Sequence, residues 1–329
     1  MKGRNTMPSK QRFVQSSLVI KIFLGVLAGV YVVYLAMRFV YPSLSTSSTS
    51  IVEHPLDANS GAEIQYWTMS SMQNAVQADE QIGNSSLTAQ SSDTTAGKAA
   101  QQQGQPPANG ESSYPLSTVG KVFMTNASGQ NMVCSGTAVI SANQSAVDTA
   151  GHCLYWNGSW VKNVIFCPLY NNGSTPYGCW AARDLEVPAD WINAPSNDFH
   201  HDLGMAVVAA NSEGTLTDVV GGAGWAYNQS ATQTYSAYGY PAAYPFNGQT
   251  RQSCEGGTGK SWQHGGGIVV SIPCNMTGGS SGGPWFVQIG GNWYLDGHND
   301  FTSSMQPGHM FSPYYDDTWY ALYQKAQNA

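Results

Sequence analysis

The sequence predicts an all-β protein that ends in a helix and is preceded by a membrane segment and a disordered linker. Short runs rich in β-branched and aromatic residues, such as VGKVFMT and PWFVQIGG, alternate with Gly, Asn, Ser and Pro from about residue 117 onward. This pattern is typical of a β-sandwich or of paired barrels. Only the last stretch has helical spacing, with Trp319, Leu322 and Tyr323 at i, i+3 and i+4.

The composition limits the classes of function. The 329 residues are 42% hydrophobic and 10% charged, with a net charge of -7, so the chain can bury a large core and is not a charge-rich disordered protein. Six of the 13 basic residues lie in the first 38 positions, and all 20 acidic residues lie after position 50. The remainder therefore has 7 basic and 20 acidic residues, without a basic cluster, which argues against nucleic-acid binding.

The N-terminal part has the pattern of a membrane segment. Residues 1–17 form a basic end, and residues 18–41 are almost wholly apolar, with Lys21 and Arg38 near the two ends of that stretch. About 20 helical residues span a bilayer core, and positive charge stays in the cytoplasm. An uncleaved single-pass anchor is favoured over a cleaved signal peptide, because no A-x-A-like site follows. In either case we expect the rest of the chain outside the cell, membrane-bound or secreted.

Residues 42–116 are rich in Ser, Thr, Gln, Ala, Asn and Gly. Such a composition buries too little apolar surface to fold alone, so it predicts a flexible linker, or one that contains a pro-segment. Its apolar island, residues 64–76, is a candidate for docking on the domain that follows. The globular domain is expected at 117–329.

All six cysteines follow the membrane segment, and none forms the C-x2-C pairs of zinc sites. An even number outside the cell indicates disulfides rather than metal ligands. Fifteen connectivities are possible, and the sequential one closes the shortest loops, so it is preferred. It pairs Cys134 with Cys153, Cys167 with Cys179, and Cys254 with Cys274. Seven N-x-S/T sequons are consistent with a glycosylated exterior protein.

Three motifs in the globular domain carry chemistry. In GSSGGPW, at 279–285, glycines around a serine allow a tight turn that brings backbone N–H groups near a substrate carbonyl. TAGHC places His152 beside a cysteine expected in a disulfide. Asp202 opens the apolar strand LGMAVV, where burial of its carboxylate requires hydrogen bonds. Together they supply a nucleophile, a base and an acid that can orient the base.

The order TAGHC, then an Asp 50 residues later, then GSSGGP 79 residues after that, resembles the chymotrypsin-type serine peptidases. The resemblance covers about 117–329. The CSGTAVIS run and the SGGPW form are most similar to the secreted bacterial trypsin-like and glutamyl endopeptidase-like branch. This resemblance implies two antiparallel six-stranded barrels with the catalytic groups in the cleft between them.

The resemblance also implies the roles of individual residues. Ser281 would attack the scissile carbonyl, His152 would act as base and then acid, and Asp202 would orient His152. The backbone N–H groups of Gly279 and Ser281 would form the oxyanion hole. The pair Cys134 and Cys153 would correspond to the disulfide that braces the histidine loop. Neither a cofactor nor a metal is expected.

Two alternatives to this site remain open. Asp198 is a rival for the acid, although Phe-His-His follows it rather than an apolar strand. The neighbours His200 and His201, beside Asp202, are compatible with a metal site but lack a third spaced ligand.

Substrate preference is predicted from two further positions that the resemblance singles out. Asn275 stands six residues before Ser281, where trypsin-like enzymes have an Asp that selects Lys or Arg. His298 lies 17 residues after Ser281, near where glutamyl endopeptidases place a His that meets the substrate carboxylate. This predicts a preference for acidic residues before the cut, with an exposed turn histidine as the alternative. Ser280 replaces the Asp that captures a new amino terminus in trypsin-like zymogens, so activation by that ion pair is not expected.

The sequence thus predicts a serine endopeptidase that acts outside the cell on protein or peptide substrates. The alternative from another class is a catalytically silent peptidase-like module displayed on the cell surface for binding. The presence of all three catalytic residue types favours the enzyme.

Overall fold

The computed structural model describes residues 49–56, 60–78, 87–89, 97–108, 113–194 and 198–329. The basic end at 1–17 and the membrane segment expected at 18–41 lie outside these residues. Within the described part of the chain, none of the helices is both long and apolar enough to cross a membrane.

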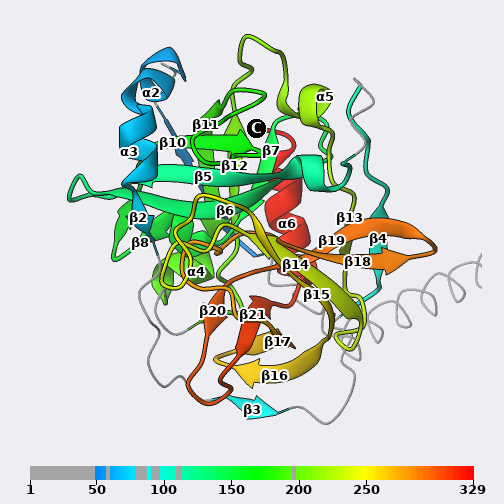
Figure 1. The fold of residues 1–329 in the computed structure, drawn as a ribbon. Coiled ribbons are helices and arrows are strands. Elements are labelled where there is room, and N and C mark those ends of the chain that lie inside the picture. The colour runs from blue at the N-terminus through cyan, green and yellow to red at the C-terminus, as the bar shows by residue number, and fades with distance from the viewer. Residues whose placement is uncertain (1–48, 57–59, 79–86, 90–96, 109–112, 195–197) are drawn as a thin grey trace, which may run out of the picture. The chain divides into compact units, whose positions relative to one another are not determined.

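Six antiparallel strands close into a barrel in the first half of the domain (Figure 1). In chain order these are β5 (Val119–Thr125), β6 (Asn131–Val139), β7 (Ala146–Thr149), β10 (Lys162–Pro168), β11 (Trp180–Pro188) and β12 (Gly204–Val208). The ladder returns to its start because β12 pairs with both β7 and β11. In β5, Val122 and Met124 pack in one apolar cluster while Val119 and Phe123 pack in another. The strand alternates its faces, and both faces are buried.

The second half contains two hydrogen-bonded sheets rather than one closed ladder. One consists of β15 (Gln252–Thr258), β14 (Thr234–Gly239), β18 (Pro284–Ile289), β19 (Asn292–His298), β13 (Trp225–Tyr227) and β4 (Ala100–Gln102). The other consists of β20 (Phe301–Thr302), β21 (His309–Pro313), β17 (Gly267–Pro273), β16 (Lys260–His264) and β3 (Thr88–Ala89). β15 packs against β17. The expected pair of six-stranded barrels is therefore closed by hydrogen bonds in its first member only, among the described residues.

Smaller elements complete the domain. They are the hairpin β8 (Tyr155–Trp156) and β9 (Ser159–Trp160), the short helices α4 (Ala189–Asn193) and α5 (Leu216–Val220), and 3-10 turns at Leu116–Thr118 and Gly151–Cys153.

The predicted C-terminal helix is confirmed as α6 (Asp317–Ala326). The side chain of Asp316 caps it by accepting a hydrogen bond from the backbone N–H of Thr318 at 2.7 Å. Trp319, Leu322 and Tyr323 are fully buried, as their helical spacing predicts. The helix is thus held by its apolar face.

The three disulfides confirm the sequential pairing. Cys134 bonds to Cys153, Cys167 to Cys179, and Cys254 to Cys274.

Much of residues 49–108 pairs with strands of the globular domain, where the composition predicted a flexible linker with or without a pro-segment. β1 (Ile51–Pro55) pairs with β11, and β2 (Val76–Gln77) runs parallel to β6. The two downstream strands β3 and β4 pair with β16 and β13. Strand edges of the barrels offer unpaired backbone groups, and these short segments satisfy them. Average composition does not reveal this strand pairing, because the pairing uses backbone N–H and C=O groups, which polar residues carry as well as apolar ones.

Two short helices between β1 and β2 provide the apolar anchor of this segment. They are α2 (Ser60–Tyr66) and α3 (Met69–Gln73), at the side of the first barrel (Figure 1). Between them, the side chain of Trp67 is 5% exposed, and its ring centroid lies 5.3 Å from that of Phe123. Its indole N–H donates to the backbone carbonyl of Asn163 at 2.7 Å. The island at 64–76 therefore docks on the domain.

Candidate active site

Pairing of β7 with β12 brings His152 and Asp202 together. Thr149 and Gly204 are partners in this ladder, and the chain turns through Gly151–Cys153 just after β7 while Asp202 lies just before β12. The Nδ1 atom of His152 lies 2.7 Å from Oδ2 of Asp202, and the backbone N–H of His152 donates to Oδ1 at 2.7 Å. Burial alone would raise the pKa of Asp202, but the charge of His152 and these hydrogen bonds outweigh it and hold the pKa below its usual value.

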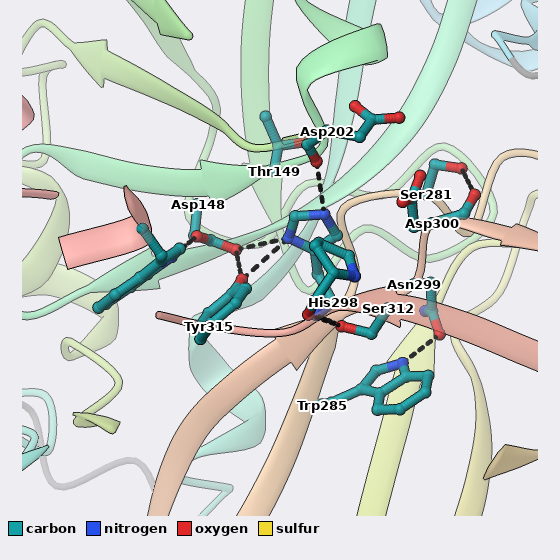
Figure 2. Close-up of polar contacts among 12 residues, drawn as sticks. Asp148, Thr149, Asp202, Ser281, Trp285, His298, Asn299, Asp300, Ser312 and Tyr315 are labelled. Atoms are coloured by element: carbon teal, nitrogen blue, oxygen red, sulfur yellow. Dashed lines mark hydrogen bonds and ion pairs between the residues drawn. The ribbon is translucent and has the colours of Figure 1, made fainter. Parts of the chain in front are cut away.

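Ser281 lies in the turn between β17 and β18 and lines the same pocket as His152. Its backbone carbonyl accepts a hydrogen bond from the N–H of Ser135 at 2.7 Å, which ties the turn to β6. Gly282, with φ of 79°, passes so close to β6 and β7 that an added Cβ would lie 2.1 Å from the Thr149 side chain. Only glycine fits there. The Ser281 hydroxyl donates to the backbone carbonyl of Asp300 at 3.2 Å (Figure 2).

The alternatives to this arrangement are held elsewhere. Asp198 accepts from Nδ1 of His201 at 2.7 Å. His200 lies 3.2 Å from the carboxylate of Asp316. The two neighbouring histidines therefore have separate carboxylate partners, and Asp202 is the acid that forms the 2.7 Å hydrogen bond with Nδ1 of His152.

The disulfide between Cys134 and Cys153 joins β6 to the residue that follows His152. Both cysteines are fully buried. The disulfide holds the histidine turn against β6. The next residue of β6, Ser135, holds the serine turn through its backbone N–H. Two turns far apart in sequence are thus fixed to one strand.

Neither a protein-family model nor a curated protein sequence matches the chain. Solved structures do match. AL20, a thermostable serine protease from an extremophilic microorganism, is 41% identical, with 65% of this chain and 98% of AL20 covered and a TM-score of 0.58. The protease Anisep from Arthrobacter nicotinovorans is 37% identical, with 69% of this chain and 100% of Anisep covered and a TM-score of 0.59.

The chain belongs to the chymotrypsin-type serine proteases. As a member of this group, the protease is a serine endopeptidase. A Glu endopeptidase is also similar, with 16% identity, 69% of this chain and 98% of its own length covered and a TM-score of 0.51, which supports the fold alone.

The pocket of the protease has a largely apolar wall beside its polar centre. Met276, Phe301 and Met310 line it, each no more than 3% exposed, together with Thr277 and Thr302. None of the described residues that line it is Lys or Arg.

Asn275, expected to contact substrate, is not among these residues and is exposed. Its neighbour Met276 faces the pocket instead. The position six residues before Ser281 lies in the segment that lines the pocket. Its own side chain faces solvent, because adjacent side chains of this segment point in different directions.

His298 was also expected to contact substrate, but it is fully buried and does not line the pocket. Its Nε2–H donates to the backbone carbonyl of Asp202 at 3.1 Å, and its Nδ1 lies 2.9 Å from the hydroxyl of Tyr315 (Figure 2). Tyr315 in turn donates to Asp148 at 2.7 Å, and Trp319 of α6 donates to the same carboxylate at 2.8 Å. The alternation of β19 directs His298 into the protein, where it links the C-terminal helix to the segment of Asp202.

Asp300 was not among the predicted site residues, yet its side chain is fully buried with one oxygen 3.6 Å from Nδ1 of His152. Its position two residues after His298, in a segment with few charges, was the available signal. Gln77 and Ala78, which line the pocket from the N-terminal segment, were not predicted either. Their small, polar surroundings in the sequence carry no signal of a catalytic cleft.

Proposed function

We propose that the protease cuts peptide bonds with Ser281 as nucleophile, His152 as general base and then acid, and Asp202 as the orienting acid. One observation carries this assignment: His152 and Asp202 form a buried pair, with Nδ1 and Oδ2 at 2.7 Å, in the pocket that Ser281 lines. Because Nδ1 faces Asp202, Nε2 is the nitrogen that can take the serine proton.

The proposed reaction needs one local movement. The Ser281 hydroxyl, which donates to the carbonyl of Asp300 in this structure, rotates toward Nε2 of His152 and attacks the scissile carbonyl. The oxyanion then accepts hydrogen bonds from the backbone N–H groups of Gly279 and Ser281, each donor contributing about 3 to 4 kcal/mol. His152 passes the proton to the leaving amine, and water releases the acyl group by the same steps in reverse.

A fluorophosphonate probe tests these roles, because it phosphonylates only an activated serine. We expect labelling of the matured protease at Ser281, located by peptide mass spectrometry so that Ser280 is distinguished. Labelling should disappear in Ser281→Ala and fall by at least about 1,000-fold in His152→Ala. Ser145→Ala, a buried serine outside the pocket, is the matched control and should label normally. Folded protein that never labels would support the silent binding module instead.

We also propose that the protease prefers an apolar residue before the cut. The wall formed by Met276, Phe301 and Met310 supports this preference. A buried substrate carboxylate would be costly there, because no Lys or Arg among the described lining residues offsets its charge. The acidic preference predicted from the sequence rested on His298, which faces Asp202 instead.

A peptide library that varies the residue before the cut tests the pocket. Phe, Leu or Met should exceed Glu and Asp by at least about 100-fold in kcat/KM. Met310→Arg should narrow this ratio by supplying a cation. Met305→Arg is the matched control, because Met305 is 49% exposed and outside the pocket. A preference of the unmodified protease for Glu would contradict the proposal.

The proposed site of action is outside the cytoplasm. Three disulfides support this, because reducing compartments do not favour them. The basic end and the apolar residues 18–41 supply the means of export or anchoring. Sequencing the amino terminus of the mature protein, with fractionation of membranes from medium, distinguishes an anchored enzyme from a secreted one. Recovery of active enzyme in the cytosol alone would contradict both.

We further propose that the N-terminal segment keeps the protease latent until it is removed. Gln77 and Ala78 line the pocket with His152 and Ser281, and the backbone N–H of Ala78 donates to the carbonyl of Val133 at 3.1 Å. A substrate that reaches the serine must displace these residues. Since Ser280 stands where a capturing Asp would lie, activation acts by release of the segment and not by a new ion pair.

A further inference from the structure

Asp300 lies within the catalytic centre although the mechanism above gives its side chain no role. The carboxyl group is fully buried, and its Oδ1 is 3.6 Å from Nδ1 of His152. Single ligand-type atoms of Asp300, Asp202 and His152 all lie within 4.8 Å of one another. The backbone of Asp300 is fixed on both sides, because its N–H donates to the carbonyl of Phe311 at 2.9 Å and its own carbonyl accepts from Ser281.

Two carboxyl groups this close in a buried site cannot both be charged. Asp202 accepts two hydrogen bonds from His152, one from the backbone and one from the ring, so it retains the negative charge. Both carboxyl oxygens of Asp300, in contrast, are buried without a close hydrogen bond among the described residues, and Nδ1 of His152 approaches Oδ1 only to 3.6 Å. Burial, followed by the charge of Asp202, raises the pKa of Asp300 well above its usual value.

A neutral acid has one O–H group, and a buried O–H needs an acceptor. The carboxylate of Asp202 is the charged acceptor beside it. We propose that Asp300 is a positioning residue of the catalytic centre: it stays protonated and donates a hydrogen bond to Asp202, which holds that carboxylate in place against His152. The inference rests on the proposed roles of Asp202 and His152.

This arrangement has two consequences for His152. The carboxylate keeps one orientation, so the ring keeps the tautomer in which Nδ1 carries the proton and Nε2 is the base. The hydrogen bond from Asp300, the third that Asp202 accepts, also draws on the negative charge of Asp202 and weakens its attraction for the imidazolium. Among the described residues, His152 and Asp202 are the titratable groups that act on Asp300. Removing the donor should therefore loosen the ring and raise the pKa of His152.

Two substitutions separate donation from packing. Asp300→Asn keeps the shape and supplies N–H donors without a titratable proton, and Asp300→Leu keeps the volume without a donor. We expect kcat/KM of the matured Asn variant to stay within about threefold of the unchanged protease. In the Leu variant kcat should fall about 10- to 100-fold, the usual effect of one hydrogen bond to a charged group, with little change in KM. The acid limb of the kcat/KM profile, which reports His152, should move to higher pH in the Leu variant only.

Asp296→Asn is the matched control, because Asp296 is a second buried acid, lies on β19 and does not line the pocket. It should leave kcat and the pH profile unchanged. Equal kinetics for the Leu variant and the unchanged protease would overturn the inference, and so would an Asn variant as impaired as the Leu variant. Thermal unfolding shows whether Asp300→Leu folds. If it does not fold, the kinetics of Asp300→Asn decide, because a loss of activity in that variant contradicts the proposal. Failure of the unchanged protease to label or cleave would instead refute the proposed function.

Discussion

The substitution Trp67→Ala tests whether the N-terminal segment blocks the catalytic pocket. Trp67 is 5% exposed, packs on Phe123 and donates to the carbonyl of Asn163. Truncating a buried tryptophan costs about 3 to 5 kcal/mol. This segment docks on a finished domain, so most of the loss weakens docking. A loss of about 3 kcal/mol lowers the ratio of docked to released segment at least 100-fold.

The assay is the rate of fluorophosphonate labelling of the uncut precursor, with its length checked by mass spectrometry. Labelling needs an open pocket, so Trp67→Ala should label at least about tenfold faster than the unchanged precursor. Met69→Ala, in the next helix and 62% exposed, is the matched control and should have no effect. Blocking of the pocket by the N-terminal segment is refuted if the unchanged precursor labels as fast as the mature enzyme, or if both variants label equally slowly while the mature enzyme is fast.

Two further predictions concern stability. Replacing Cys134 and Cys153 together by Ser removes a crosslink with a sequence separation of 19 and should lower the free energy of unfolding by about 3 kcal/mol in urea denaturation. Unchanged stability would mean that the link does not constrain the unfolded chain. Burial and then the charge of Asp184 raise the pKa of Glu186 to about 8. The folded state therefore binds more protons than the unfolded state between pH about 5 and 8, and stability should fall as the pH rises through this range. Glu186→Gln should flatten this slope, and an unaltered slope would exclude Glu186 as its source.

Local patterns predicted much of the fold. The run VGKVFMT is β5, residue for residue, and the helical spacing around Trp319 is α6. The residues of β11 do not show such an apolar pattern. Asp184 and Glu186 are buried there, at 5% and 0% exposure, so charged residues interrupt the apolar pattern that marks a buried strand. The N-terminal segment was missed for a related reason, because a few apolar anchors such as Trp67 are diluted by polar neighbours.

The sequence by itself determined the protease family, favoured the observed disulfide pairing, and identified the segments of His152, Asp202 and Ser281 that meet at the pocket, but not the N-terminal segment that also lines it. Motifs such as TAGHC and GSSGGP depend on local backbone geometry, and local geometry is encoded by neighbouring residues. Only the tertiary structure decided which side chain of each segment faces the reacting atoms: Met276 rather than Asn275, and Asp300 rather than His298. That choice depends on how elements distant in sequence pack against one another, and a shift of one or two residues along an extended segment is enough to change it.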